Sequence, residues 1–195
     1  MSAKQIHKYL YYYQINIINI INIINIINKL KKKTKKDLAK IEFLLMDLDG
    51  CLTTGHIIYS SNGEDTKIFH THDGYGIVRG REMGLKYAVI SGMSSKVNRM
   101  RVEKLKIHHI YEDIQDKVIP FEELKLKYNL KKENFAYIGD DEFDIPLLKQ
   151  VGFSCCPKSG IEEVKKHVDY VCKKNGGEGA VREIIDLILK AKDLI

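Results

Sequence analysis

Short apolar runs alternate with longer amphipathic stretches from residue 41 to the end of the chain. Each run is followed by polar or glycine-rich sequence, a pattern typical of buried parallel strands. The expected strands are 41–46, 85–90, 107–111, 135–138, 153–156 and 170–172. The expected helices are 76–83, 94–104, 116–128, 144–151, 161–166 and 180–190. Strands that alternate with helices at this spacing predict an α/β fold with a central parallel sheet.

Two extended segments, 56–59 and 66–69, flank the dipeptide Asn62-Gly63. Asn-Gly between β-branched and aromatic runs is a strong hairpin signal, so we expect a β-hairpin flap over the ends of the parallel strands. Between Asp49 and Ser91 there is room only for this hairpin and one helix. The sequence therefore predicts no inserted cap domain.

Residues 1–40 follow a different pattern. The segment 15–28 repeats Ile-Ile-Asn, and a period of three fits neither an α-helix nor a strand. We interpret residues 1–40 as a low-complexity Ile/Asn- and Lys-rich extension and residues 41–195 as the domain. Membrane contact is the alternative for the extension. The basic run 29–36 would favour a surface anchor, whereas a true span would be short and would carry its asparagines into lipid.

Charge also separates the extension from the domain. The formal net charge is +6, but residues 1–40 hold nine lysines and one aspartate, whereas the other 155 residues hold 23 basic and 25 acidic side chains. The domain is close to neutral and lacks a basic stripe or an aromatic platform, so we do not expect nucleic acid as a partner. The four cysteines form no Cys-x-x-Cys pair, which favours a reducing, cytoplasmic compartment without disulfides or a zinc site.

Candidate chemistry lies just past the strand ends, where parallel sheets place their functional side chains. Asp47 and Asp49 follow the first strand, and strand alternation points both side chains the same way. Two carboxylates at one strand end repel each other unless a cation or a proton lies between them, which predicts a metal-assisted site. The other polar or glycine positions that follow strand ends are Ser91, Gly92, Lys117, Asp140, Asp141 and Asp144.

The order of these residues resembles the four motifs of the haloacid dehalogenase superfamily of phosphohydrolases: Asp47-Leu48-Asp49, Ser91, Lys117 and Gly139-Asp140-Asp141-Glu142-Phe143-Asp144. From Ile41 to Leu189 the chain resembles the small phosphatases of 3-deoxy-D-manno-octulosonate 8-phosphate (KDO 8-phosphate). The further marks of this resemblance are Gly50, Leu52-Thr53, Gly63-Glu64, Phe69, Asp73 to Ile77, Asp116-Lys117 and Asn175 to Glu183. The resemblance implies a Rossmann-like α/β fold.

The resemblance also implies a mechanism that agrees with the chemistry of these residues. Asp47 attacks phosphorus and forms an aspartyl-phosphate, while Asp49 protonates the leaving alcohol and later takes a proton from water. The backbone carbonyl of Asp49 and the side chains of Asp47 and Asp140 ligate Mg²⁺, a cation that suits oxygen ligands. Asp141 and Asp144 orient these groups without touching the metal.

The remaining candidate residues bind the substrate. By the resemblance, Ser91 and Gly92 contact the phosphoryl oxygens, and Lys117 neutralises their charge and holds Asp47. Arg101 and Lys104 lie on the helix after Ser91 and are candidates for contact with a sugar carboxylate. A solvated helix face is the alternative for both.

Departures from the family pattern concern the sugar rather than the catalysis. Family members usually carry Asp where Thr54 stands, and Arg where His72 and Met93 stand. The related phosphatases of nine-carbon sugars (KDN 9-phosphate) tend to carry Glu at the position of Met93 and Lys at that of Lys104. Lys104 therefore favours the nine-carbon group, whereas Met93 fits neither pattern.

The resemblance implies a homotetramer in which the hairpin packs into a central barrel and Gly176–Ala180 reaches a neighbouring active site. Flexible glycines permit such an approach, and an ordinary loop is the alternative. We expect a phosphatase of KDO 8-phosphate in lipopolysaccharide biosynthesis. The alternatives are a KDN/sialic-acid-type 9-phosphate phosphatase and, in another class, a non-catalytic membrane-surface or assembly protein.

Overall fold

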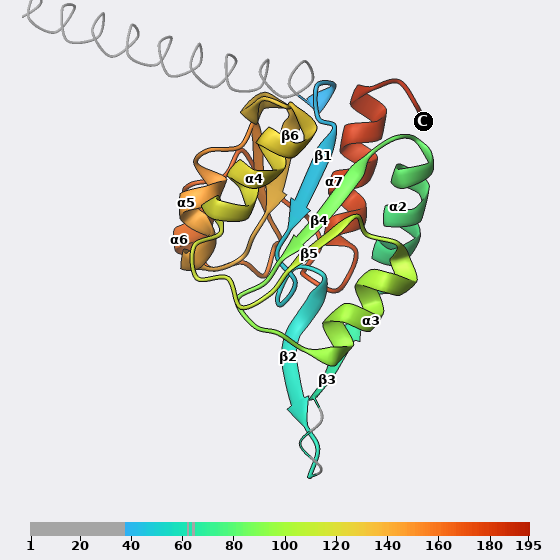
Figure 1. The fold of residues 1–195 in the computed structure, drawn as a ribbon. Coiled ribbons are helices and arrows are strands. Elements are labelled where there is room, and N and C mark those ends of the chain that lie inside the picture. The colour runs from blue at the N-terminus through green and yellow to red at the C-terminus, as the bar shows by residue number, and fades with distance from the viewer. Residues whose placement is uncertain (1–37, 62, 64) are drawn as a thin grey trace, which may run out of the picture. The chain divides into compact units, whose positions relative to one another are not determined.

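The computed structural model describes residues 38–61, 63 and 65–195. Six parallel strands form the central sheet in the order β5-β4-β1-β6-β7-β8 (Figure 1). They are β1 (Phe43–Met46), β4 (Lys86–Ile90), β5 (His109–Tyr111), β6 (Phe135–Ile138), β7 (Phe153–Cys156) and β8 (Tyr170–Val171). The predicted α/β fold with a parallel sheet is confirmed, and each strand lies within or close to its predicted range.

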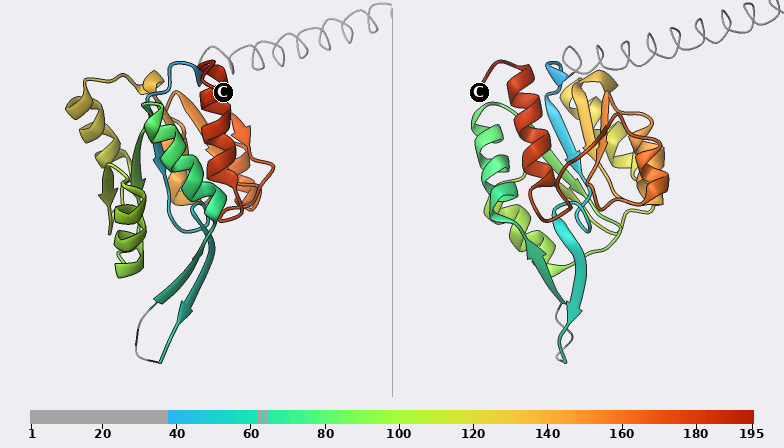
Figure 2. Two further views of the ribbon diagram at one scale, coloured as in Figure 1. Left: turned by 90° about the vertical axis from the view of Figure 1, so that its right-hand side faces the viewer. Right: turned by 180° about the vertical axis from the view of Figure 1, so that it is seen from behind.

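The central strand β1 is buried on both faces. Its side chains alternate, so that Leu44 and Met46 pack in one apolar cluster and Phe43 and Leu45 in another. Figure 2 shows one group of helices on each face of the sheet. The first group is α2 (Thr71–Glu82), α3 (Lys96–Leu105) and α7 (Ala180–Ala191). The second group is α4 (Val118–Tyr128), α5 (Ile145–Leu148) and α6 (Glu162–Lys165), with the short 3₁₀ helices η1 (Lys132–Asn134) and η2 (Glu142–Asp144) beside it in the chain.

The predicted hairpin is present, and it projects from the carboxyl end of the sheet (Figures 1 and 2). Strands β2 (Thr53–Tyr59) and β3 (Asp65–Phe69) pair antiparallel, with Ile57 opposite Lys67. Strand β2 begins three residues before the predicted range because Thr53 pairs with Phe69, and the register shifts between Thr53 and Ile57. Gly55 lies in this irregular stretch with a φ of 78°, a conformation that glycine adopts without strain.

Helix α2 begins at Thr71, five residues before the predicted start at Gly76. Its glycines are contact points: a Cβ at Gly76 would lie 2.7 Å from Cδ of Arg182 on α7. The side chain of His70 caps the helix by accepting a hydrogen bond from the amide of His72. Close packing between α2 and α7 therefore explains glycines that local propensity alone disfavours.

Helix α5 and the start of the folded domain differ from the expected ranges. The helix expected over 144–151 is only α5, which ends at Leu148 and is preceded by η2. Leu38 already lies in the apolar core, so the folded domain includes residues before Ile41. The Ile/Asn repeat, with its proposed membrane contact, lies outside the described residues. Within the described ranges, no helix has the length and apolar character needed to cross a membrane.

Candidate active site

The nucleophile candidate Asp47 forms an ion pair with Lys117. Asp47 directly follows β1, and its amide donates to the carbonyl of Ile138 at 2.9 Å, which extends the pairing of β1 with β6. Lys117 lies at the N-terminus of α4, 70 residues away in sequence, and its Nζ is 2.7 Å from Oδ1 of Asp47. Both side chains are buried, which strengthens the interaction compared with a surface pair.

A second buried carboxylate, Asp144, holds Lys117 from the other side. Its Oδ1 accepts from Lys117 Nζ at 2.6 Å and also from the hydroxyl of Tyr137. Its Oδ2 accepts from the amides of Asp140 and Asp141 at 2.8 and 3.1 Å. Asp144 therefore fixes both the lysine and the loop that presents Asp140, and its orienting role in the reaction stays a prediction.

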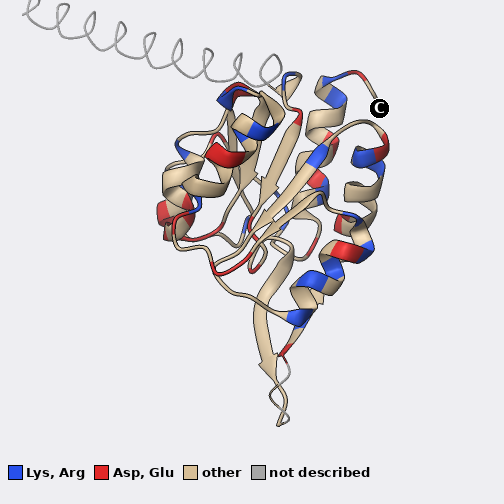
Figure 3. Cartoon of the chain, in the orientation of Figure 1, with Lys and Arg blue, Asp and Glu red and all other residues tan. Residues whose placement is uncertain are grey.

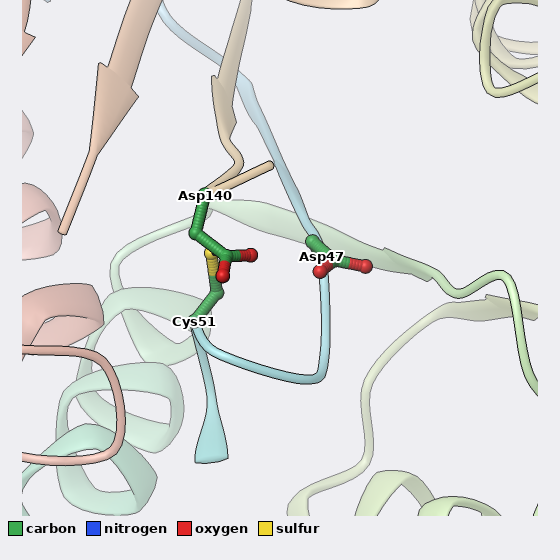
Figure 4. Close-up of side chains that lie close together, drawn as sticks. All are labelled: Asp47, Cys51 and Asp140. Carbon is green, nitrogen blue, oxygen red and sulfur yellow. The ribbon is translucent and has the colours of Figure 1, made fainter. Parts of the chain in front are cut away.

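The side chains of Asp47, Cys51 and Asp140 lie close together (Figure 4). One ligand atom from each lies within 4.8 Å of the other two, and among the described residues this is the group that could hold a metal ion. The two carboxylates suit a hard divalent cation such as Mg²⁺. The Cys51 sulfur, 3.7 Å from Asp140 Oδ1, does not, because burial and the nearby Asp140 raise the pKa of this thiol well above its ordinary value.

The two carboxylates are electrostatically strained when no cation lies between them. Burial raises the pKa of Asp47 to about 6, although Lys117 opposes the shift. Burial, together with the nearby Asp47 and Asp144, raises the pKa of Asp140 to about 8. For Lys117 burial alone would lower the pKa, but the facing carboxylates of Asp47 and Asp144 raise it above its ordinary value. A divalent cation would relieve the repulsion, so the donor set fits the predicted metal.

Both oxygens of Asp49 accept hydrogen bonds from the hairpin. Lys67 Nζ lies 2.7 Å from Oδ2, and Thr53 Oγ1 lies 3.2 Å from Oδ1. Sequence reasoning missed Lys67, because a single lysine in an exposed strand carries no motif. The available signal was alternation, since Lys67 lies on the opposite face of β3 from Thr66 and Ile68 and is the buried position of that strand.

Most of the candidate residues line a cavity of about 330 Å³ at the carboxyl ends of the strands. Its lining residues are Asp47, Asp49, Ser91, Gly92, Met93, Ile114, Gln115, Lys117, Asp140, Asp141, Phe143 and Asp144. The Ser91 hydroxyl donates to the Met93 carbonyl at 2.9 Å and accepts from the Met93 amide at 3.2 Å. Ser91 thus holds the turn at the cavity wall, and its contact with phosphate stays a prediction.

The predicted roles of Asp141, Arg101 and Lys104 stay predictions. Asp141 lines the cavity, but its side chain is exposed and accepts from the amide of Glu142 at 2.7 Å. The described residues that line the cavity do not include Arg101 or Lys104. The Arg101 guanidinium lies over the ring of Phe69, and Lys104 is exposed on α3. Their contact with substrate also stays a prediction.

The glycine segment before α7 packs against the loop that follows β1. The amide of Gly177 donates to the Cys51 carbonyl at 3.0 Å, and a Cβ at Gly176 would lie 1.6 Å from the Gly50 carbonyl oxygen. A Cβ at Gly50 would in turn lie 2.0 Å from Oδ2 of Asp140. These glycines therefore permit a close stack within one chain, and the approach of this segment to a neighbouring site stays a prediction.

Comparison with known proteins agrees with this geometry. A family model described as haloacid dehalogenase-like hydrolase matches residues 86–185. The 3-deoxy-D-manno-octulosonate 8-phosphate phosphatase KdsC of Escherichia coli K12 is 38% identical over 152 residues, which cover 78% of this chain and 81% of the relative. The chain belongs to this family of haloacid dehalogenase-like phosphatases.

Solved structures of the phosphatase family share the fold. The enzyme from Yersinia pestis superposes with a TM-score of 0.82 at 36% identity and covers 83% of this chain and 88% of its own. The enzyme from Moraxella catarrhalis, solved with magnesium, phosphate and KDO, gives a TM-score of 0.80 at 37% identity and covers 82% and 92%. The resemblance read from the motifs is thereby confirmed.

Proposed function

We propose that this chain hydrolyses KDO 8-phosphate to KDO and phosphate, with Mg²⁺ as cofactor. The proposal rests on one observation: Asp47, Lys117 and Asp140 lie close together in the lining of a cavity that Asp49 also lines. The family membership supports the substrate, since relatives 37 and 38% identical carry this name and one is solved with magnesium, phosphate and KDO.

The first half of the reaction transfers the phosphoryl group to Asp47. A carboxylate oxygen of Asp47 bonds to phosphorus while the bond from phosphorus to the sugar oxygen breaks. Asp49 gives its proton to that sugar oxygen, so the sugar leaves as a neutral alcohol. Lys117 holds Asp47 in place and compensates negative charge on the phosphoryl oxygens. Mg²⁺, when bound, offsets the repulsion between the phosphate dianion and the carboxylates.

The second half releases phosphate. Asp49, now a carboxylate, takes a proton from water as the water oxygen attacks phosphorus. The bond between phosphorus and Asp47 breaks, and Asp47 returns as a carboxylate. Asp144 holds Lys117 in place, and Lys117 in turn holds the Asp47 carboxylate in position for the next cycle.

We also propose that the protein works as a homotetramer. The hairpin exposes Ile58, Tyr59 and Ile68, at 52%, 67% and 49% of their surface, which is unfavourable for a lone chain in water. Arg101 and Lys104 do not line their own chain's cavity, and we propose that the segment Gly176–Ala180 reaches the active site of a neighbouring chain. Helix α3, which bears both, carries four basic side chains and one acidic one (Figure 3), and that charge suits a sugar acid.

A nine-carbon sugar 9-phosphate is the second candidate substrate. Lys104 favours it, because phosphatases that resemble this chain and act on nine-carbon sugars tend to carry lysine at this position. Phosphate release from KDO 8-phosphate, KDN 9-phosphate and simpler sugar phosphates, with and without Mg²⁺, tests the proposal. We expect the highest kcat/KM with KDO 8-phosphate and loss of turnover in EDTA. Preference for the nine-carbon ester would change the substrate, and metal-independent or absent turnover would contradict the proposed function.

The four cysteines are buried and free, which supports a cytoplasmic location.

A further inference from the structure

Lys67 is the buried residue of an otherwise exposed or half-buried strand, β3. Its side chain keeps 1% of its accessible surface, and its Nζ lies 2.7 Å from Oδ2 of Asp49. Lysine is almost never fully buried unless it is paired, because removing the ammonium group from water is costly. The pairing with Asp49 is therefore the reason that this lysine can lie inside.

The hairpin fixes Asp49 at both oxygens. Thr53, in β2, donates to Oδ1 at 3.2 Å, and its own Oγ1 accepts from the amides of Gly50 and Gly55 at 3.3 and 3.2 Å. Each carboxylate oxygen has two acceptor positions, so these contacts leave one on each oxygen. The carboxylate is thus held in one orientation while it can still exchange a proton with a group in the cavity.

Lys67 itself is separated from the cavity. Asp49 is one of the residues that line the cavity, whereas Lys67 is not. Each of the two catalytic aspartates therefore has its own buried lysine. Lys117, from the body of the domain, holds Asp47, and Lys67, from the hairpin, holds Asp49.

We propose that Lys67 is a positioning residue that acts through Asp49, so that the hairpin supplies the cation that orients the acid–base carboxylate. The inference rests on the proposed function, since it requires Asp49 to protonate the leaving alcohol. Without the lysine, Asp49 would keep only the hydrogen bond from Thr53 on this side, and the less restrained carboxyl group would meet the leaving oxygen less often. The transfer of phosphorus to Asp47 would itself remain possible.

The test compares two leaving groups. The sugar alkoxide of KDO 8-phosphate needs a proton to leave, whereas p-nitrophenolate, from p-nitrophenyl phosphate, leaves without one. We measure kcat/KM, which reports the steps up to departure of the leaving group, for the wild type, Lys67→Met, Lys67→Arg and Asp49→Asn. Lys127→Met, which removes an exposed lysine on α4, is the matched control.

For Lys67→Met we expect kcat/KM to fall by about 10²-fold with the sugar phosphate and by less than about fivefold with the aryl phosphate, as loss of an oriented general acid predicts. Lys67→Arg, which keeps the cation, recovers part of the loss, and Lys127→Met behaves like the wild type. The ratio of the two kcat/KM values does not depend on the amount of folded enzyme, so partial unfolding of a variant cannot imitate this result.

Equal losses with both substrates, or no loss with the sugar phosphate, would overturn the role of Lys67. The Asp49→Asn variant separates this outcome from a failure of the proposed function. If Asp49→Asn shows the difference between substrates and Lys67→Met does not, only the positioning role fails. If Asp49→Asn shows no difference, Asp49 is not the acid, and the mechanism itself is wrong.

Discussion

Lys117 and Asp144 form a buried ion pair, with 2.6 Å between Nζ and Oδ1, that joins the N-terminus of α4 to the short helix η2 after β6. Asp144 is also an acceptor for the amides of Asp140 and Asp141, so it connects the lysine beside the nucleophile to the loop of the metal-ligand candidate. The geometry of the whole site therefore depends on a side chain that is not itself expected to contact substrate.

Replacement of Asp144 tests this dependence. Asp144→Asn removes one of the two carboxylates that face buried Lys117 and weakens the hydrogen bonds from Tyr137 and from the amides of Asp140 and Asp141, at a cost of about 1–3 kcal/mol of unfolding free energy. We expect a loss of this size in urea unfolding and a strong fall in kcat. Asp141→Asn, on an exposed side chain that caps η2, is the matched control and should change stability by less than about 1 kcal/mol, because Asn caps as well as Asp. Equal effects of the two variants would contradict the orienting role.

The pKa values of Asp47 and Asp140 predict how stability changes with pH when metal is removed. Both carboxyl groups bind protons more tightly in the native state than in the unfolded chain, where their pKa values lie near 3.8. The native state therefore holds more protons between pH values of about 4 and 8, and its free energy of unfolding falls as pH rises through this window. Unfolding at several pH values in EDTA measures the slope, and Asp140→Asn should flatten it.

The same protons compete with the metal. Mg²⁺ must displace the proton of Asp140, so its apparent affinity should increase by about tenfold for each unit that pH is raised towards pH 8. Calorimetric titration with Mg²⁺ at pH 6, 7 and 8 gives this dependence directly. An affinity that does not change with pH would show that Asp140 is not a ligand.

Exposed isoleucines on the hairpin allow a test of the proposed tetramer. Ile58 and Ile68 are exposed, on the face of the hairpin opposite Lys67. The double substitution Ile58→Lys and Ile68→Lys should convert a tetramer into smaller species, because four chains would bring these charges together. Light scattering measures the mass. Leu126→Lys, on the exposed surface of α4, is the control and should leave the tetramer intact. A tetramer that survives the double substitution would place the interface elsewhere.

Deletion of the extension tests the domain boundary. Removal of residues 1–36 should leave activity and stability unchanged, because every candidate site residue lies after position 46. Removal of residues 1–40 also deletes Leu38, which is buried, and the Ala39 carbonyl that accepts from Lys192 at 2.9 Å. We expect this second deletion to cost about 2–3 kcal/mol, as loss of a buried leucine does. Loss of activity in the shorter deletion would give the extension a role in the reaction.

The sequence predicted those parts of the site that depend on strand ends. Apolar runs locate the strands, and parallel strands bring the residues after them to one edge, so Asp47, Lys117 and Asp140 were expected to meet. The order of motifs then assigned their roles. The general rule for parallel sheets was enough for these predictions, without knowledge of how particular side chains pack.

The contacts that sequence did not predict join segments whose proximity has no local signal. Asp73, in the first turn of α2, accepts from the amides of Gly179 and Arg182 at 3.1 and 2.7 Å, and so caps α7 from another helix. Only glycine fits at position 176, because a Cβ there would clash with the carbonyl oxygen of Gly50. The pairing of Lys67 with Asp49 depends on how the hairpin folds back. Each is set by tertiary packing rather than by neighbours in sequence.

The most direct test of the central claim is detection of the phosphoryl group on Asp47. Enzyme quenched in acid during turnover of KDO 8-phosphate with Mg²⁺ is digested and analysed by mass spectrometry. We predict a peptide that contains Asp47 and carries one added phosphoryl group, which is absent from Asp47→Asn and from the wild type in EDTA. Turnover that continues in Asp47→Asn, or a phosphoryl group on another residue, would contradict the account.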